Sequence, residues 1–137
     1  MKNLVEKLVA DALAALPPGT LGDATTPAPG VERCRESAHG DFATNVAMQV
    51  AKTARTNPRA LAQKIVAALP ANDLVAKTEI AGPGFINFFL TPAAWKAEMS
   101  RVLAEGAQYG RGDAGAGLKA IVEFVSANPT GPLHVGH

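Results

Sequence analysis

The sequence has few of the features that mark a secreted or membrane-bound protein. Its 137 residues include a single cysteine, and aromatic residues make up only 5%. One cysteine excludes both a disulfide framework and a cysteine-rich zinc site, so Cys34 is expected to be a small hydrophobic residue in a reducing cytosol. No run reaches the about 20 apolar residues of a membrane span, and Glu6 and Asp11 interrupt the apolar N-terminus, unlike in a signal peptide. We therefore expect a soluble, cytoplasmic protein with no membrane partner.

A strong excess of one charge is also lacking. The 13 basic and 12 acidic residues give a formal net charge of +1, which excludes a polybasic nucleic-acid binder but permits a local basic face. Hydrophobic residues make up 47% of the chain, enough for a core. Four basic residues cluster around one predicted helix pair and could contact phosphates, although such charges usually form only a solvated face: Lys52, Arg55, Arg59 and Lys64.

What is present is a succession of short helices and strands. Apolar residues recur at helical spacing in four segments, and two β-rich segments flank the tight Gly-Pro-Gly connection at 82–84. Asn57 and Thr91 each precede a proline, which is the pattern of a helix cap followed by a first-turn proline. The predicted elements are a helix over 3–16 capped by Asn3, a weak strand over 31–35, a turn and helix over 39–52, a helix over 57–69, strands over 74–81 and 85–90, and a helix over 91–105.

Two of these elements carry specific packing predictions. The strand over 85–90 is two-sided, with Ile86, Phe88 and Leu90 on one face and Phe85, Asn87 and Phe89 on the other. The helix over 91–105 is expected to bury its apolar positions, Trp95, Met99, Val102 and Leu103.

The order of elements predicts an α+β fold, a two-layer sandwich of helices on an antiparallel sheet, over residues 1–109. Residues 110–117, GRGDAGAG, have the composition of a flexible linker. The near-continuous apolar run LKAIVEFV (118–125) is typical of a parallel strand buried on both faces. Such a strand needs partners, so we interpret 118–137 as the start of a second, truncated domain.

The loop SANPTGPLHVGH (126–137) stands where doubly wound sheets bind ligands, after the carboxyl end of a strand. His134 and His137 would share one face of a helix and could donate hydrogen bonds to phosphate oxygens. A bare H-x-G-H pattern is equally compatible with two exposed loop histidines or an adventitious metal-binding pair. The preceding buried strand and the S-x-N-P-T-G-P-L context favour the functional interpretation.

This loop resembles the His-Ile-Gly-His signature of class I aminoacyl-tRNA synthetases, with Val135 in place of isoleucine. The longer run VEFVSANPTGPLHVGH is similar to the form found in arginyl-tRNA synthetases. HGDFATNVAMQVAK (39–52) and IAGPGFINFFL (80–90) resemble the paired motifs of that family's N-terminal additional domain. The resemblance spans essentially the whole chain, and it implies that 118–137 opens a Rossmann-type catalytic domain.

The resemblance also implies roles for single residues. His134 and His137 match the signature histidines that engage ATP phosphates during adenylate formation, and Gly136 matches the position against which adenine lies. Glu123 and Asn128 match residues that help to bind arginine; a carboxylate suits a cationic amino acid, and an amide both donates and accepts. Without the family resemblance, we would interpret Glu123 as a solvated charge at the end of a strand and Asn128 as a turn residue.

In the additional domain, Phe85 and Asn87 match positions that read a nucleobase of the tRNA elbow, around the D-loop, by stacking and hydrogen bonding. We expect both side chains to be exposed on the sheet face opposite Ile86, Phe88 and Leu90. The pattern alone would instead favour a core phenylalanine beside a strand-edge asparagine.

The resemblance as a whole implies the N-terminal part of an arginine–tRNA ligase. The full enzyme would use arginine, ATP with magnesium, and tRNA, and would be a monomer; this part alone would be inactive, and it would hold no metal of its own. Two alternatives remain. The first is a small nucleotidyltransferase, a class that also uses an H-x-G-H loop; in such proteins the strand that precedes the loop normally stands at the N-terminus of the chain. The second is a freestanding RNA-binding module without catalytic activity.

Overall fold

A computed structural model of the chain describes residues 1–22, 28–113, 115–122 and 131–132. The chain divides into two units, Met1–Gly106 and Ala107–His137. All strands and α-helices of the described residues belong to the first unit. Two 3₁₀ helices complete the described elements, Ser37–His39 and Gly106–Gln108.

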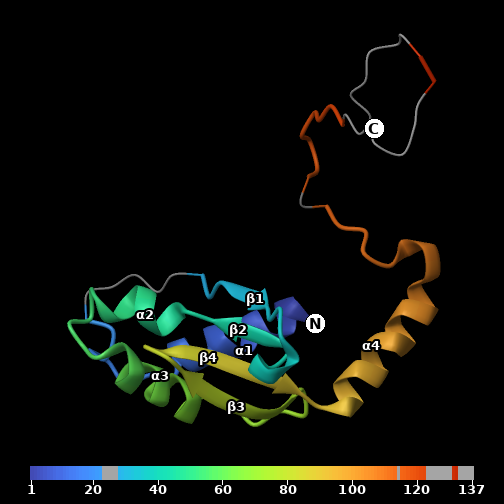
Figure 1. Cartoon of the computed structure of the whole chain (residues 1–137). Coiled ribbons are helices and arrows are strands. Elements are labelled where there is room, and N and C mark those ends of the chain that lie inside the picture. The colour runs from blue at the N-terminus through green and yellow to red at the C-terminus, as the bar shows by residue number, and fades with distance from the viewer. Residues whose placement is uncertain (23–27, 114, 123–130, 133–137) are drawn as a thin grey trace. The chain divides into compact units, whose positions relative to one another are not determined.

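Four antiparallel strands form one sheet, in which the last strand along the chain is an inner one (Figure 1). The order across the sheet is β1 (Val31–Arg33), β2 (Phe42–Thr44), β4 (Phe85–Leu90) and β3 (Val75–Ala81). Asn87 lies at the middle of this arrangement, because it is paired with Ala43 on one side and with Glu79 on the other. The predicted pair of strands around Gly-Pro-Gly is confirmed as the β3–β4 hairpin.

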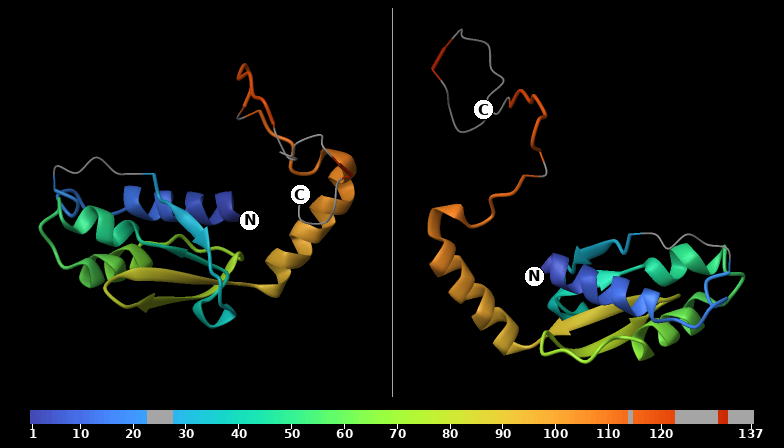
Figure 2. Two further views of the ribbon diagram at one scale, coloured as in Figure 1. Left: turned by 45° about the horizontal axis from the view of Figure 1, so that its top comes forward. Right: turned by 180° about the vertical axis from the view of Figure 1, so that it is seen from behind.

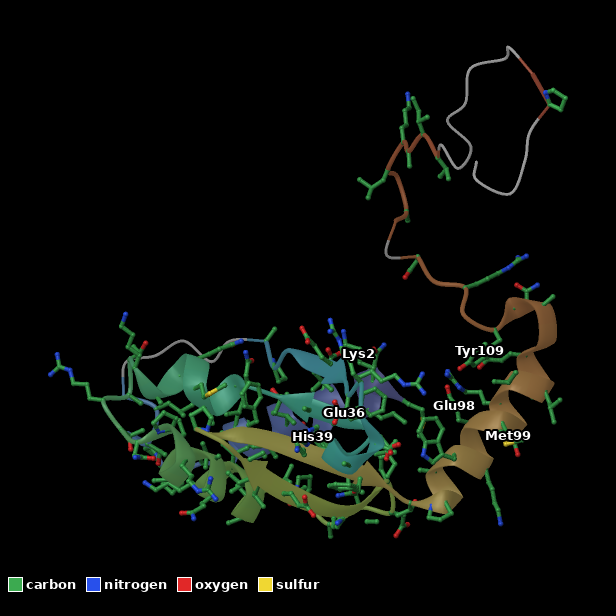
Figure 3. All side chains as sticks on the ribbon, in the orientation of Figure 1. Lys2, Glu36, His39, Glu98, Met99 and Tyr109 are labelled. Carbon is green, nitrogen blue, oxygen red and sulfur yellow. The ribbon has the colours of Figure 1, made fainter. Side chains whose placement is uncertain are left out.

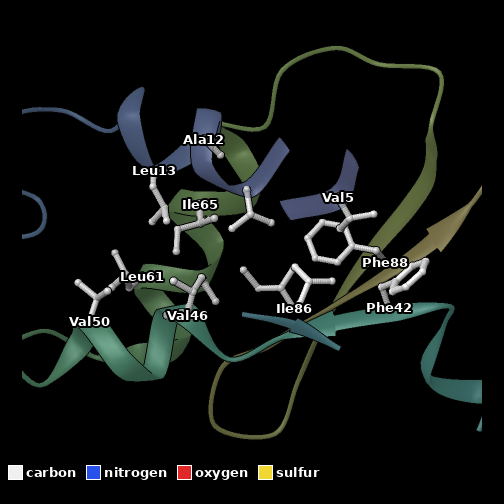
Figure 4. Close-up of a cluster of buried hydrophobic side chains, with 14 of the residues drawn as sticks. Val5, Ala12, Leu13, Phe42, Val46, Val50, Leu61, Ile65, Ile86 and Phe88 are labelled. Carbon is white, nitrogen blue, oxygen red and sulfur yellow. The ribbon is translucent and has the colours of Figure 1, made fainter. Parts of the chain in front are cut away.

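Three helices pack against one face of the sheet: α1 (Lys2–Ala14), α2 (Val46–Ala51) and α3 (Pro58–Ala67) (Figure 2). Their apolar residues meet those of β2 and β4 in a single core (Figure 4). The central side chains of this core include Val5, Val9, Phe42, Val46, Leu61, Ile65, Ile86 and Phe88. The fold is therefore α+β, with helices on an antiparallel sheet, as the order of elements predicted.

Caps and prolines define the starts of two helices as predicted. Asn57 accepts hydrogen bonds at Oδ1 from the backbone N–H groups of Arg59 (2.9 Å) and Ala60 (3.2 Å). Thr91 Oγ1 accepts from the N–H of Ala94 at 3.0 Å, at the start of α4 (Pro92–Glu105). These oxygens satisfy donors that have no partner within the helix.

Two local predictions were wrong. The helix α1 begins at Lys2, with Met1 rather than Asn3 at its N-cap and no side-chain cap bond. Residues 42–44 form a strand instead of leading into a helix, because Phe42 pairs with Phe88 across the sheet. The helix α2 starts only after Thr44, whose Oγ1 accepts from the N–H of Val46 at 3.2 Å.

The helix α4 buries less than its sequence pattern predicted. Trp95 is half-buried and packs against the core. Met99, labelled in Figure 3, is exposed. Val102 and Leu103 are also exposed, the latter with 82% of its surface free. The apolar stripe is real as a pattern, yet only its beginning reaches the core of the first unit.

The strand expected over 118–125 is not formed in its described part. Residues 118–122 have no regular secondary structure, and Leu118, Ile121 and Val122 are exposed. A strand is held by its neighbours in a sheet, and none of the described strands pairs with this segment.

Candidate nucleic-acid interface

The sheet face that points away from the core carries the candidate site. Side chains alternate between the two faces of a strand, so Phe85, Asn87 and Phe89 point opposite to the buried Ile86 and Phe88. The strand register adds neighbours to this outer face: Glu32 and Ala43 on one side of Asn87, and Glu79 with Lys77 on the other.

Phe85 is 40% exposed, which is unusual for a large aromatic side chain on an inner strand. Its place is fixed by the preceding turn, which two contacts hold against α3. Arg59 donates from Nη1 to the Gly82 carbonyl at 2.9 Å. A Cβ on Gly84, whose φ is +144°, would lie 3.1 Å from the Pro58 carbonyl group, so only glycine fits this approach.

Asn87 is only 5% exposed, contrary to the expectation that its side chain would be open to solvent. Strands lie on both sides of it, and two phenylalanines, Phe85 and Phe89, flank it on the same face of its own strand. Among the described residues its amide has no hydrogen-bond partner. Neither the amide oxygen nor the amide nitrogen is fully buried without a partner. The small exposed part of Asn87 therefore includes its amide, which remains available for a hydrogen bond from the outer face.

A cavity of about 170 Å³ opens beside Phe85. It is lined by residues from the loop before β1 and from β1, β2, the start of α2, and β4, namely Gly30, Glu32, Ala43, Thr44, Asn45, Gln49 and Phe85. Gln49 Nε2 donates to Asn45 Oδ1 at 2.7 Å, which fixes the orientation of both amides. The cavity thus offers an aromatic wall together with amide and carboxylate groups.

The opposite end of the outer face is already occupied by an internal interaction. Lys77 Nζ lies 4.1 Å from the centroid of the Phe89 ring and 2.7 Å from Glu79 Oε1. Phe89 therefore has a cation over its ring. In the described part of the chain, no such cation covers Phe85.

Residues between β1 and β2 support the sheet. Asp41 Oδ2 accepts from the N–H of Leu90 at 2.7 Å, which ties the segment before β2 to the end of β4. Cys34 Sγ donates to the His39 carbonyl at 3.2 Å. Partial burial, and then the negative charge of Asp41, raise the pKa of the Cys34 thiol.

The residues predicted to bind ATP and arginine lie outside the described residues. These are His134, Gly136 and His137 for ATP, and Glu123 and Asn128 for arginine. Over the part of the chain that the structure describes, no three side chains of His, Cys, Asp or Glu gather into a metal site. No helix in these same ranges is long and apolar enough to cross a membrane.

Sequence reasoning found Phe85 and Asn87 but missed the cavity walls. Glu32 lies on β1, whereas Asn45 caps α2 and Gln49 lies within it, and their approach to Phe85 depends on the β1–β2–β4 register. The anchoring role of Arg59 was also missed, since its partner, Gly82, is distant in sequence. The one available signal was the Asn45 and Gln49 pair, which has the i,i+4 spacing of a helical contact.

The comparisons with known proteins agree with one another. A family model described as the arginyl tRNA synthetase N terminal domain matches residues 3–90. An arginine–tRNA ligase of Thioalkalivibrio sulfidiphilus is 55% identical over 100% of this chain and 24% of its own length. Another, of Halorhodospira halophila, is 54% identical over 100% of this chain and 24% of its own length. The chain thus spans about a quarter of the length of these curated relatives.

Solved structures give the same result at the level of the fold. Thermus thermophilus arginyl-tRNA synthetase matches with a TM-score of 0.57 and 26% identity, over 72% of this chain and 15% of that one. A Plasmodium falciparum arginyl-tRNA synthetase matches with a TM-score of 0.59 and 10% identity, over 74% and 18% of the two chains, and supports the fold alone. Neither the nucleotidyltransferase nor the freestanding RNA-binding module is favoured by these matches. The chain belongs to the arginyl-tRNA synthetase family, and residues 3–90 correspond to that family's N-terminal domain.

Proposed function

We propose that this chain is the N-terminal part of an enzyme that joins arginine to tRNA, and that the outer face of its sheet contacts the tRNA elbow around the D-loop. The observation that carries the proposal is Phe85, an exposed ring at the edge of a cavity. Sequence-specific RNA recognition commonly uses unstacked loop bases that stack on aromatic side chains.

The surroundings of Phe85 support stacking rather than a role in the core. The turn before it is held against α3 by Arg59 and Gly84, so the ring is positioned before a ligand arrives. The adjacent cavity of about 170 Å³ can accept part of a planar base. The Asn87 amide lies two residues along the same face and can both donate to and accept from a base edge.

The remaining parts of the proposal concern chemistry beyond the first unit. Residues 1–109 form the additional domain, 110–117 a linker, and 118–137 the first strand and signature loop of a Rossmann-type catalytic domain. His134 and His137 bind ATP phosphates, Gly136 packs against adenine, and Glu123 and Asn128 bind arginine. Magnesium accompanies ATP, and the full-length enzyme works in the cytoplasm as a monomer.

The test is the Phe85→Ala substitution in the full-length enzyme. Loss of one base–aromatic stack costs about 1–3 kcal/mol, so the apparent KM for tRNA should rise by about 5- to 150-fold, while the KM values for ATP and arginine stay constant. Phe89→Ala is the matched control, because this ring lies on the same strand and face but already has Lys77 over it. An unchanged KM for tRNA in Phe85→Ala would remove the elbow contact from this face.

A further inference from the structure

The helix pair α2–α3 lies in a stretch of sequence without negative charge. No aspartate or glutamate occurs between Asp41 and Asp73, although the chain contains 12 acidic residues. All four charged residues of this stretch are basic: Lys52, Arg55, Arg59 and Lys64. A chain with a net charge of only +1 therefore has four positive charges in this one segment, two in the turn after α2 and two on α3.

The structure leaves these cations without acidic partners. All four side chains are exposed, and none takes part in an ion pair among the described residues. Four other basic residues of the first unit do have acidic partners, namely Lys2, Lys7, Lys77 and Arg101; Lys7 lies 2.7 Å from Asp11 and Lys77 lies 2.7 Å from Glu79. An uncompensated cluster of this kind attracts polyanions.

Two separate links place Arg59 and Lys52 near the Phe85 cavity. Arg59 donates to the carbonyl of Gly82, three residues before Phe85. Lys52 is the C-cap residue directly after α2 and keeps a helical backbone, and it follows Gln49 by three residues; residues at i and i+3 lie on one side of a helix. Because Gln49 lines the cavity together with Phe85, Lys52 lies on the side of α2 that faces it.

The backbone at Arg55 gives an independent indication. Its φ of +49° is the only positive value recorded for a non-glycine residue among the described residues. Glycine adopts this conformation without steric cost, whereas arginine does not. A non-glycine residue held in this conformation identifies a candidate functional position.

We propose that the α2–α3 basic cluster (Lys52, Arg55, Arg59 and Lys64) binds the phosphates of the tRNA strand whose base stacks on Phe85. This inference rests on the proposed function and adds the positioning half of that contact. Phosphate contacts fix the register of a nucleic acid, whereas base contacts supply specificity. The cluster and the cavity together would hold one nucleotide by its base and its neighbours by their backbone.

Salt dependence separates these two kinds of contact. Each phosphate neutralised by a side chain contributes about 0.7–0.9 to the slope of log K against log salt concentration. We therefore expect the full-length enzyme carrying Lys52→Gln with Arg55→Gly to bind tRNA with a slope about 1–2 smaller in magnitude. The control carries Lys96→Gln with Arg111→Gln, which removes the same two charge types from exposed positions elsewhere and should leave the slope unchanged.

The Arg55→Gly substitution alone removes folding as an explanation. Glycine suits the backbone conformation at position 55, so the Tm of the Arg55→Gly enzyme should not fall below that of the wild type. Its affinity for tRNA at low salt should nevertheless fall several-fold. Equal slopes in the double variant and the wild type would overturn the basic cluster as a phosphate site.

Phe85→Ala tests the proposed function independently, because it should weaken binding equally at every salt concentration. If Phe85→Ala weakens binding while the double variant does not, the elbow contact stands and the basic cluster is only a solvated face.

Discussion

At the scale of single residues, similar side chains on one strand differ in how far their neighbours cover them. Phe85 and Phe89 share the outer face of β4, but only Phe89 lies under a lysine ammonium. Asn87 between them is nearly covered, yet its amide makes no hydrogen bond within the described residues. The face therefore combines one uncovered ring with one amide that has no partner among the described residues, and the proposed contact with a base would use both.

Cys34 allows a prediction at this scale. Its raised pKa means that the folded protein retains the thiol proton at a pH where the unfolded chain has begun to lose it. Iodoacetamide alkylates the thiolate, so the pH at half-maximal alkylation rate should be higher for the folded protein than for the same protein in urea.

Asp41→Asn provides the check on the cause. Removing the negative charge of Asp41, the smaller contribution, should move the folded profile part of the way back. Identical alkylation profiles for folded and unfolded protein would contradict the assignment. The contribution of the protonated thiol to the free energy of unfolding is complete at low pH. It declines as the pH rises through the pKa of the unfolded state and then through that of the folded state.

At the scale of elements, the start of α3 depends on one side chain. Asn57 Oδ1 accepts two backbone N–H groups, so Asn57→Ala leaves both without that partner. We expect a loss of about 0.5–2 kcal/mol in the free energy of unfolding, measured by urea denaturation. Asn57→Ser keeps an acceptor oxygen and should retain most of the stability. Equal losses in both variants would show that the cap oxygen does not stabilise α3.

The elements differ in how far the sequence could predict them. Proline after Asn57 and Thr91 marks two helix starts by local chemistry alone, and both are confirmed. Phe42, Val46 and Val50 have helical spacing although Phe42 belongs to a strand, because pairing with Phe88 outweighs the local pattern. The apolar stripe of α4 identifies the helix correctly but cannot tell which part of it meets a core.

The same division applies to the candidate site. The exposure of Phe85 follows from strand alternation, which the sequence displays. The covering of Asn87 does not, since it depends on the inner position of β4 between β2 and β3. The cavity depends on the same strand order, because Glu32 and Gln49 reach Phe85 only when β2 pairs with β4.

At the scale of the whole molecule, one hydrophobic core stabilises the first unit, and Phe88 is its largest fully buried side chain. Phe88→Ala should cost about 3–5 kcal/mol, a large part of the about 5–15 kcal/mol that stabilises a typical domain. Thermal melting should therefore show a strongly lowered Tm or no cooperative transition.

Phe85→Ala is the matched comparison, since it removes the same ring from the other face of the same strand. Its side chain is 40% exposed, so the Tm should stay near that of the wild type. A collapse of the Tm in Phe85→Ala would assign this ring to the core and exclude it from RNA recognition.

The strand order has a consequence for synthesis on the ribosome. The strand β2 leaves the ribosome well before β4, its inner neighbour, because residues 45–84 lie between them. Until β4 emerges, the edge of β2 has free backbone groups that invite pairing with other chains. Both the β2–β4 ladder and the cavity at Phe85 are therefore completed late, when β4 is inserted between β2 and β3, which have already been synthesised.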